Sequence, residues 1–354
     1  MDDAPVNLLV AAAAFPIGII FGVMVRWGDF CTMGAISDIG LMGDWRRFRA
    51  WMLALAIAIA ASQFLHIGEF INLDNSIYLS PRLGWAGAIA GGGMFGFGMM
   101  LAGGCGSKNA VRLGGGNLKS LLVVLVLGLV AYATLRGILA LPRLRLDDAT
   151  AIDLSGLAHD QSLATLAAGA GLGEAAMLRP LIAAGLVLSL VVFTFTSPRF
   201  LRSPRHWLSA IVIGLAIPLG WIVTGILGAD SFDPAPLASL TFVAPVGEGL
   251  IYLMTYTGAT VSFGIAAVAG TVFGGFLASL AQGQFRLETF ADGNDFLRHL
   301  VGAALMGAGG VLAMGCTIGQ GLTGLSTLAV GSLIAVLALI GGSVLGLRYL
   351  QAHL

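Results

Sequence analysis

Long runs without a single charged side chain divide the sequence. The runs of 19 or more residues without Asp, Glu, Lys, Arg or His are 4–25, 83–107, 180–198, 207–229, 249–285 and 300–347. A helix needs about 20 apolar residues to cross a hydrocarbon core of roughly 30 Å, so each of these runs predicts a transmembrane helix. The last two, of 37 and 48 residues, are long enough for two crossings or for a broken one.

Two shorter uncharged runs of 16 residues, 50–65 and 120–135, also predict spans. Arg49, Lys119 and Arg136 flank them, and such side chains extend a span by reaching along it to the membrane surface. The pattern as a whole predicts an all-α integral membrane protein with about nine transmembrane helices.

The composition supports a membrane protein and argues against other classes. Of the 354 residues, 57% are apolar and 10% are charged, whereas soluble proteins have roughly 25% charged residues. The 18 basic and 18 acidic residues cancel, so no overall field attracts a nucleic acid, and the expected surroundings are a lipid bilayer.

The basic residues of the short loops predict the orientation, because Lys and Arg favour the cytoplasmic side. Three groups follow the first, third and fifth spans: Arg46, Arg47 and Arg49; Lys108, Arg112 and Lys119; and Arg199, Arg202 and Arg205. Alternating the faces from there places the N-terminus outside and the C-terminus in the cytoplasm. Arg143 and Arg145, which fall outside, are the exception.

A repeat at an offset of 211 residues relates two of the apolar segments. Residues 96–105 and 307–316 share both leading glycines, a Leu-Ala pair and a closing Gly-Cys. The span count gives the two copies opposite directions, and inverted repeats with interrupted helices indicate a transport site near the middle of the membrane. We therefore expect one membrane domain with a first repeat half over 1–140, a connecting region with one span over 141–206 and a second half over 207–354.

A helix break is expected beside each cysteine. Residues 300–314 form about 22 Å of helix, which is too short to cross the membrane, and three glycines follow within residues 317–324. A helix that restarts there presents free amides and a partial positive charge, which favour an anion. Lys108 and Arg112 follow Cys105 closely, and residues 26–35 form another polar interruption around Cys31, so short re-entrant helices are expected.

The cysteines have two interpretations. A buried cysteine is usually a small apolar side chain, but three beside helix breaks favour polarisable S–H contacts to a sulfur-bearing ion. Gln320 and Thr323 fit either a ligand contact or hydrogen bonding between helices. A metal site is disfavoured because the cysteines have no local spacing or neighbouring ligands. The sequence contains no catalytic motif and none for a cofactor, so no enzyme is expected.

Three motifs resemble the YeeE/YedE sulfur-transport family: residues 29–35, 104–119 and 315–331. The resemblance implies an hourglass-shaped helical protein of a bacterial inner membrane, with nine spans and short horizontal helices. It implies thiosulfate as the transported ion and Cys31, Cys105 and Cys316 as pore-lining residues. It also implies a small cytoplasmic sulfur carrier of the TusA type as a partner, and it leaves selenium or another sulfur species open as cargo.

The main hypothesis is a permease that moves a small sulfur-containing anion inward. The predicted pathway residues are Cys31, Gly104, Cys105, Lys108, Arg112, Gly315, Cys316, Thr317, Gln320 and Thr323. The alternatives are a membrane protein that transfers sulfur through covalent cysteine chemistry, which needs an activated thiolate, and a structural subunit.

Overall fold

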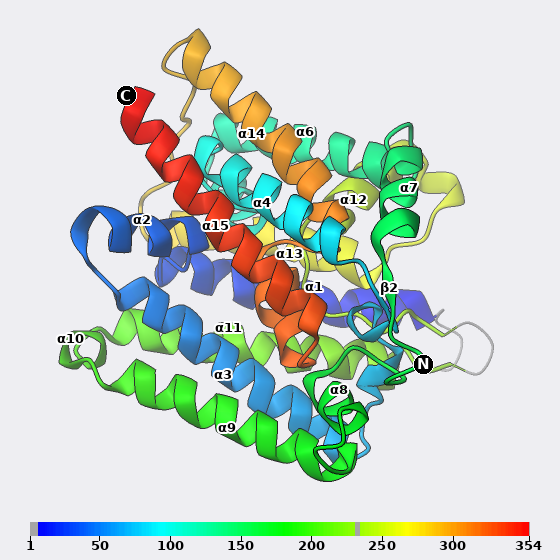
Figure 1. The fold of residues 1–354 in the computed structure, drawn as a ribbon. Helices are drawn as coiled ribbons and strands as arrows, with labels where there is room; N and C mark the ends of the chain where they lie inside the picture. Colours follow the sequence, from blue (N-terminus) through cyan, green and yellow to red (C-terminus); the bar gives the residue numbers. More distant parts are fainter. Residues whose placement is uncertain (1–5, 231–233, 354) are drawn as a thin grey trace.

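The computed structural model describes residues 6–230 and 234–353 and is almost entirely helical (Figure 1). Eight helical segments within these residues are long and apolar enough to cross a membrane. They are Val6–Met42, Arg46–Ile67, Trp85–Gly114, Leu118–Leu135, Ala175–Phe195, Pro204–Leu227, Phe263–Ala281 and Val330–His353. The prediction of an all-α integral membrane protein is confirmed.

The count differs slightly from the predicted nine. The additional long helix is α14 (Gly293–Leu312), which has 20 residues but carries Asp295, Arg298 and His299 in its first turns. It packs against α4 (Trp85–Leu101) and α6 (Leu118–Leu135), and its polar start pairs with a neighbour: Asp295 accepts from Lys119 Nζ at 2.7 Å. Lys119 therefore holds α6 to α14.

Short helices interrupt the long segments where the sequence predicts breaks. The first segment consists of α1 (Val6–Trp27) and α2 (Thr32–Met42), and the third joins α4 to α5 (Gly106–Gly114). After α14 the chain turns at Cys316 into η5 (Gly319–Gly324) and continues as α15 (Val330–His353).

The remaining elements connect these helices. The other helices are η1 (Leu73–Asn75), η2 (Ile77–Leu79), α3 (Arg46–Ile67), α7 (Ala140–Thr150), α8 (Leu163–Gly169), α9 (Ala175–Phe195), α10 (Pro198–Leu201), α11 (Pro204–Ile222), η3 (Val223–Leu227), α12 (Ala244–Met254), η4 (Tyr256–Gly258) and α13 (Phe263–Ala281). Two strands of two residues, β1 (Arg82–Leu83) and β2 (Ile152–Asp153), pair antiparallel with Arg82 opposite Asp153.

Glycines let α4 and α14 cross at backbone contact. A Cβ atom on Gly98 would lie 2.6 Å from the carbonyl oxygen of Gly302, and one on Gly302 would lie 2.6 Å from that of Gly98. Gly91 and Gly309 make the same contact at 2.5 and 2.6 Å. The offset of 211 converts one pair into the other, because Gly91 corresponds to Gly302 and Gly98 to Gly309. The crossing is thus the kind of self-complementary contact that a two-fold axis produces.

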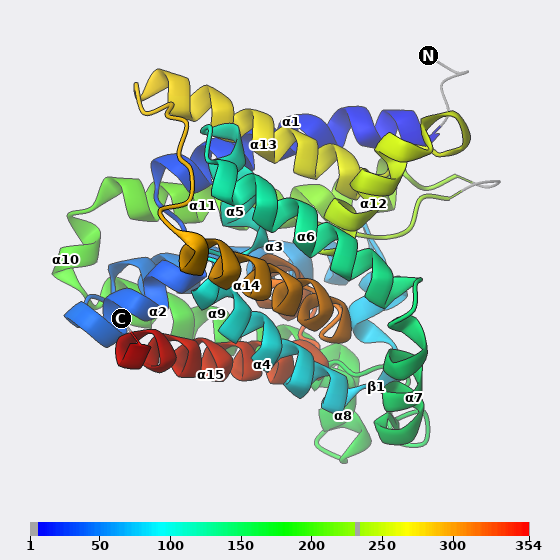
Figure 2. The ribbon, with the colours of Figure 1, turned by 90° about the horizontal axis from the view of Figure 1, so that it is seen from above.

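The other large helix contacts recur in the same way (Figure 2). Helix α1 packs along α13, and α11 packs along α3; α4 packs along α15, and α14 along α6. The repeat relates α1, α3, α4 and α6 to α11, α13, α14 and α15, so it turns the α1–α13 contact into the α11–α3 contact and the α4–α15 contact into the α14–α6 contact. The division at residues 140 and 206 stays a prediction.

The molecule has two opposite ends along its helices (Figure 1). We call the end with the start of α1, α7 and α8 the N-terminal face, and the end with α2, α10 and the end of α15 the C-terminal face. The Lys and Arg residues toward the N-terminal face are Arg82, Arg136, Arg143, Arg145 and Arg179. The greater number of basic residues, from α10 and from the starts of α3 and α11 among others, lies toward the C-terminal face.

Candidate functional site

Each cysteine thiol sits at the start of a helix inside the protein. Cys31 caps α2, and its Sγ accepts a hydrogen bond from Gly34 N at 3.4 Å. Cys316 precedes the helical turn that leads into η5, and its Sγ accepts from Gly319 N at the same distance. Cys105 is the N-cap residue of α5, and its Sγ lies 3.3 Å from Ser107 Oγ without bonding to a backbone amide of the helix. The three cysteine residues are 5%, 2% and 0% exposed for Cys31, Cys105 and Cys316.

The fold brings the three thiols together. Cys105 lies close enough to both Cys31 and Cys316 to interact electrostatically with each. The repeat places Phe242 where Cys31 stands in the other half, and Phe242 is fully buried beside Cys316. The arrangement thus has four related positions, with three thiols and one aromatic ring.

A basic cavity of about 640 Å³, lined in part by α5, the helix that follows Cys105, opens toward the C-terminal face. It is lined by Arg26, Trp27, Asp29, Lys108, Val111, Arg112, Arg205, Gln282 and Gln284. Four cations face one carboxylate, so the lining carries a net charge of +3. Such a cavity concentrates small anions.

Lys108 and Arg112 line this cavity and also bond to residues close to the helix break at Cys105. Lys108 Nζ donates to Asp29 Oδ1 at 2.6 Å, and Arg47 pairs with the other oxygen of the same carboxylate. Arg112 donates to the carbonyl oxygen of Gly103 at 2.6 Å, at the end of α4. Both cations thus lie within two turns of the Cys105 thiol, where the sequence placed them.

Gln320 and Thr323 bond to backbone carbonyls. Thr323 Oγ1 donates to Leu240 O at 2.8 Å, and Gln320 Nε2 donates to Ala313 O in the turn before Cys316. In the first repeat Asn109 matches Gln320, and its Nδ2 donates to Gly104 O at 2.8 Å and to Cys105 O at 3.1 Å. These contacts fit the interpretation of hydrogen bonding between helices, and the two amides act as braces for the breaks.

Gly104, Gly315 and Thr317 complete the predicted set. A Cβ on Gly315 would lie 3.1 Å from the Gln320 side chain, and one on Gly104 would lie 3.4 Å from that of Lys108. Both glycines therefore let the braced turns close tightly. Thr317 Oγ1 is buried and has no hydrogen-bond partner within the described part of the chain.

Sequence reasoning missed Asp29, Asn109, Arg26 and Arg205. Asp29 lies in the first motif, and Asn109 aligns with Gln320 at the repeat offset, so both carried a signal. Arg26 and Arg205 come from the ends of other helices, and only the tertiary arrangement assigns them to the cavity.

The side of the cysteines toward the N-terminal face is filled. The offset carries the cavity residues Asp29, Lys108, Val111 and Arg112 to Leu240, Gly319, Leu322 and Thr323, all of which are buried. The protein is therefore open near Cys105 toward the C-terminal face and packed at the matching place on the other side.

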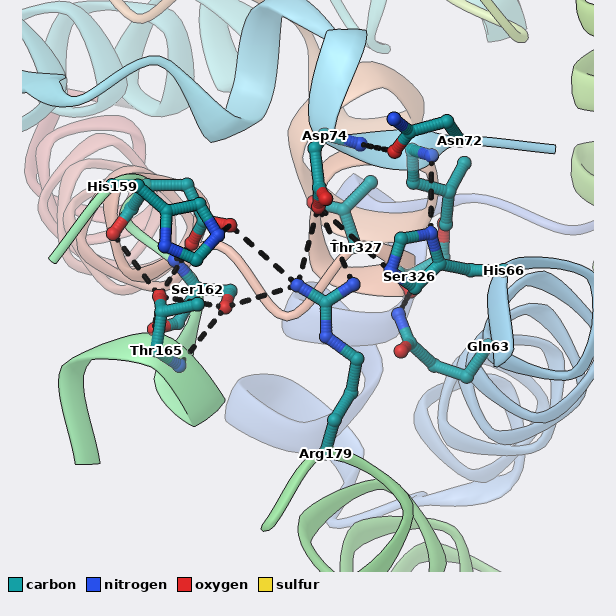
Figure 3. Close-up of polar contacts among 12 residues, drawn as sticks. Gln63, His66, Asn72, Asp74, His159, Ser162, Thr165, Arg179, Ser326 and Thr327 are labelled. Atoms are coloured by element: carbon teal, nitrogen blue, oxygen red, sulfur yellow. Dashed lines mark hydrogen bonds and ion pairs between the residues drawn. The ribbon is translucent and has the colours of Figure 1, made fainter. Parts of the chain in front are cut away.

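A second polar cluster lies on the N-terminal face around the guanidinium of Arg179 (Figure 3). Ligand atoms of Asp74, His159 and Asp160 lie within 4.8 Å of one another, which is close enough for a metal ion. Arg179 Nη2, however, stands 3.3 Å from Asp74 and 3.6 Å from Asp160, so a fixed positive charge already faces both carboxylates.

Residues 27–345 match the family described as Sulphur transport. The chain belongs to the Sulphur transport family. Members with similar sequences include the thiosulfate transporter TsuA of Spirochaeta thermophila, 27% identical over 92% of this chain and 95% of that one. The thiosulfate transporter TsuA of Escherichia coli is 25% identical over 86% of this chain and 84% of its own length. The probable transporter YedE of Escherichia coli is 30% identical over 26% of this chain and 21% of its own.

The matched span of the Sulphur transport family includes all three cysteines and every residue that lines the basic cavity except Arg26. The resemblance drawn from the motifs is thereby confirmed at the level of the family.

Proposed function

We propose that this protein is a membrane permease for thiosulfate that moves the ion past Cys31, Cys105 and Cys316. The observation that supports this most is that three buried cysteines stand at helix starts in a member of the Sulphur transport family, and that the helix after Cys105 lines a basic cavity. Two relatives that cover most of the chain are named thiosulfate transporters.

The chemistry of the site suits a small sulfur dianion. Helix starts supply amide dipoles, and the thiols supply weak donors with polarisable sulfur. Such contacts replace water stepwise while remaining weak enough for the ion to leave, which a conducting site requires. The basic cavity then draws the ion toward the C-terminal face.

We assign the C-terminal face to the cytoplasm, because it carries the greater share of Lys and Arg. Transport toward it is uptake, and the location is the inner membrane of a bacterium. A small cytoplasmic sulfur carrier of the TusA type would meet the ion at this face.

Growth on thiosulfate as the sole sulfur source tests the function in a host that lacks its own importers. The intact gene should restore growth, and Cys316→Ala should not, at equal protein levels in the membrane. Growth restored equally by both would remove the thiols from the mechanism, and no growth with the intact protein would remove thiosulfate as cargo.

Covalent sulfur transfer by the cysteines predicts a different observable. Mass spectrometry of the protein after turnover would show an added sulfur on a cysteine. Unmodified cysteines during active uptake contradict that alternative and support passage through non-covalent contacts.

A further inference from the structure

Arg179 joins three separate segments on the N-terminal face (Figure 3). It lies in the first turns of α9 and is 7% exposed. Its Nη2 is 3.3 Å from Asp74 Oδ1 in η1, 3.6 Å from Asp160 Oδ2 and 3.4 Å from Ser162 Oγ, the last two in the loop before α8.

The segment that Asp74 belongs to is largely buried and lies near Cys316 on this side. Leu73, Tyr78 and Leu79 of η1 and η2 are 0%, 5% and 1% exposed. Tyr78 lies near Cys316 and packs edge-on against Trp221 with ring centroids 6.5 Å apart. The η1–η2 segment is therefore the packing between the N-terminal face and Cys316.

The position that the repeat relates to η1–η2 lies on the opposite face, and there the protein is open. Gln282 and Gln284 line the basic cavity, and the offset carries them to Ile71 and Leu73. Residues that border open space at one end thus correspond to residues that fill it at the other. Displacing η1–η2 would create the matching opening toward the N-terminal face.

The loop that contains Asp160 connects Arg179 with the chain that follows η5. Val330 N donates to Gln161 O at 3.0 Å, and Leu163 N donates to Leu328 O at 3.0 Å. The loop that contacts the guanidinium is thereby bonded to the chain on the far side of the Cys316 break.

The contacts of Arg179 are looser than those of a settled ion pair. Charge-assisted N–H···O bonds are usually about 2.7–2.9 Å long, whereas those of Arg179 are 3.3–3.6 Å. Asp160 Oδ2 is buried and makes no hydrogen bond within the described residues. A cavity of about 450 Å³, lined in part by Arg179 and Asp74, gives small ions access.

We propose that Arg179 is the first anion-contacting residue on the N-terminal side, and that its pairing with Asp74 holds the η1–η2 segment closed until an anion replaces the carboxylate. A divalent oxyanion presents oxygens that a guanidinium binds as it binds a carboxylate. When the anion takes Arg179, Asp74 loses its guanidinium partner and keeps the longer contact with His66 Nε2 at 3.8 Å, so the hold on η1–η2 weakens and the segment is released. This inference rests on the proposed function.

Hydrogen–deuterium exchange of the full-length protein measures the release directly. In Asp74→Asn we expect exchange over residues 73–79 to be at least about tenfold faster than in the wild type, which corresponds to roughly 1.4 kcal/mol of lost closure. Asp148→Asn is the matched control, because it removes an exposed ion pair with Arg82 on the same face. Unchanged exchange in Asp74→Asn would overturn the proposal.

Anions provide the second arm of the same measurement. Thiosulfate or sulfate should speed exchange over residues 73–79 in the wild type and leave Arg179→Gln unaffected. No response in the wild type, or an equal response in Arg179→Gln, would contradict the role of Arg179. Protection of the segment by Zn²⁺ in the wild type would identify a metal site at Asp74 and overturn the proposal.

Uptake kinetics separate anion contact from a purely structural role. Arg179→Gln should raise KM at least tenfold, and Arg179→Lys should recover part of the loss. A fall in maximal rate with unchanged KM in both variants would make Arg179 structural. If wild-type protein takes up no thiosulfate, the proposed function fails, while the exchange experiment with sulfate still decides whether the segment is latched.

Discussion

Removing Lys108 tests the electrostatic part of the proposed mechanism. Its Nζ lies 2.6 Å from Asp29 Oδ1, and its side chain is only 8% exposed. Four cations and one carboxylate line the cavity, so Lys108→Gln lowers the net charge of the lining from +3 to +2. A dianion in this cavity loses attraction when that charge is removed.

The size of the loss follows from Coulomb's law. For a dianion about 8 Å from the removed charge, the loss is roughly 4 kcal/mol at an effective dielectric constant of about 20, and roughly 1 kcal/mol in bulk water. Since about 1.4 kcal/mol is a factor of ten, even the smaller value raises KM about fivefold. We therefore expect at least a fivefold higher KM for thiosulfate uptake into proteoliposomes.

A double variant and a control variant show why KM rises in Lys108→Gln. Lys108→Gln combined with Asp29→Asn leaves three cations and no carboxylate, which restores the lining to +3. Recovery of KM in the double variant indicates that the field acts, and no recovery indicates direct contact between Lys108 and the ion. Lys119→Gln is the control, because Lys119 pairs with Asp295 and does not line the cavity. A wild-type KM in Lys108→Gln, or a change no larger than in the control, would refute the reasoning.

Two other predictions concern the scaffold around the site. Gly302→Ala should lower the melting temperature of the purified protein, because its Cβ would lie 2.6 Å from Gly98 O, whereas Gly341→Ala, whose Cβ meets no atom within 4 Å, should not; equal melting temperatures would contradict the close crossing of α4 and α14. Asn109→Ala removes the donors to Gly104 O and Cys105 O, which should cost roughly 1–3 kcal/mol and slow thiosulfate uptake by protein that still purifies as a folded species. Uptake at the wild-type rate would show that the brace is dispensable.

The main architecture could be predicted from the sequence because the length of an apolar run, taken as a helix, can be compared directly with the thickness of the hydrocarbon core of a membrane. The break at Cys316 was predictable for the same reason, since the 15 residues before it form a helix that cannot cross, and glycines follow it. The break at Cys105 was predicted from the repeat and from Lys108 and Arg112 close by. The repeat then made the proximity of the two thiols a reasonable expectation, and the structure places them near each other.

The lining of the cavity could not be predicted in full. Arg26 and Gln284 are separated by 258 residues and meet only because α1 packs along α13. The sequence also does not show where a polar side chain points. Gln320 and Thr323 fit either an ion contact or a hydrogen bond to the backbone, and only the structure shows that they donate to the carbonyl oxygens of Ala313 and Leu240.

Uptake of ³⁵S-labelled thiosulfate into proteoliposomes by Cys105→Ala protein tests the central claim most directly. Cys105 lies near enough to interact electrostatically with each of the other two thiols, so its loss removes the thiol that both have as a neighbour. With equal amounts of folded protein in the vesicles, we expect uptake to fall to the level of empty liposomes. Uptake by Cys105→Ala at the wild-type rate would contradict passage of the ion along the thiols.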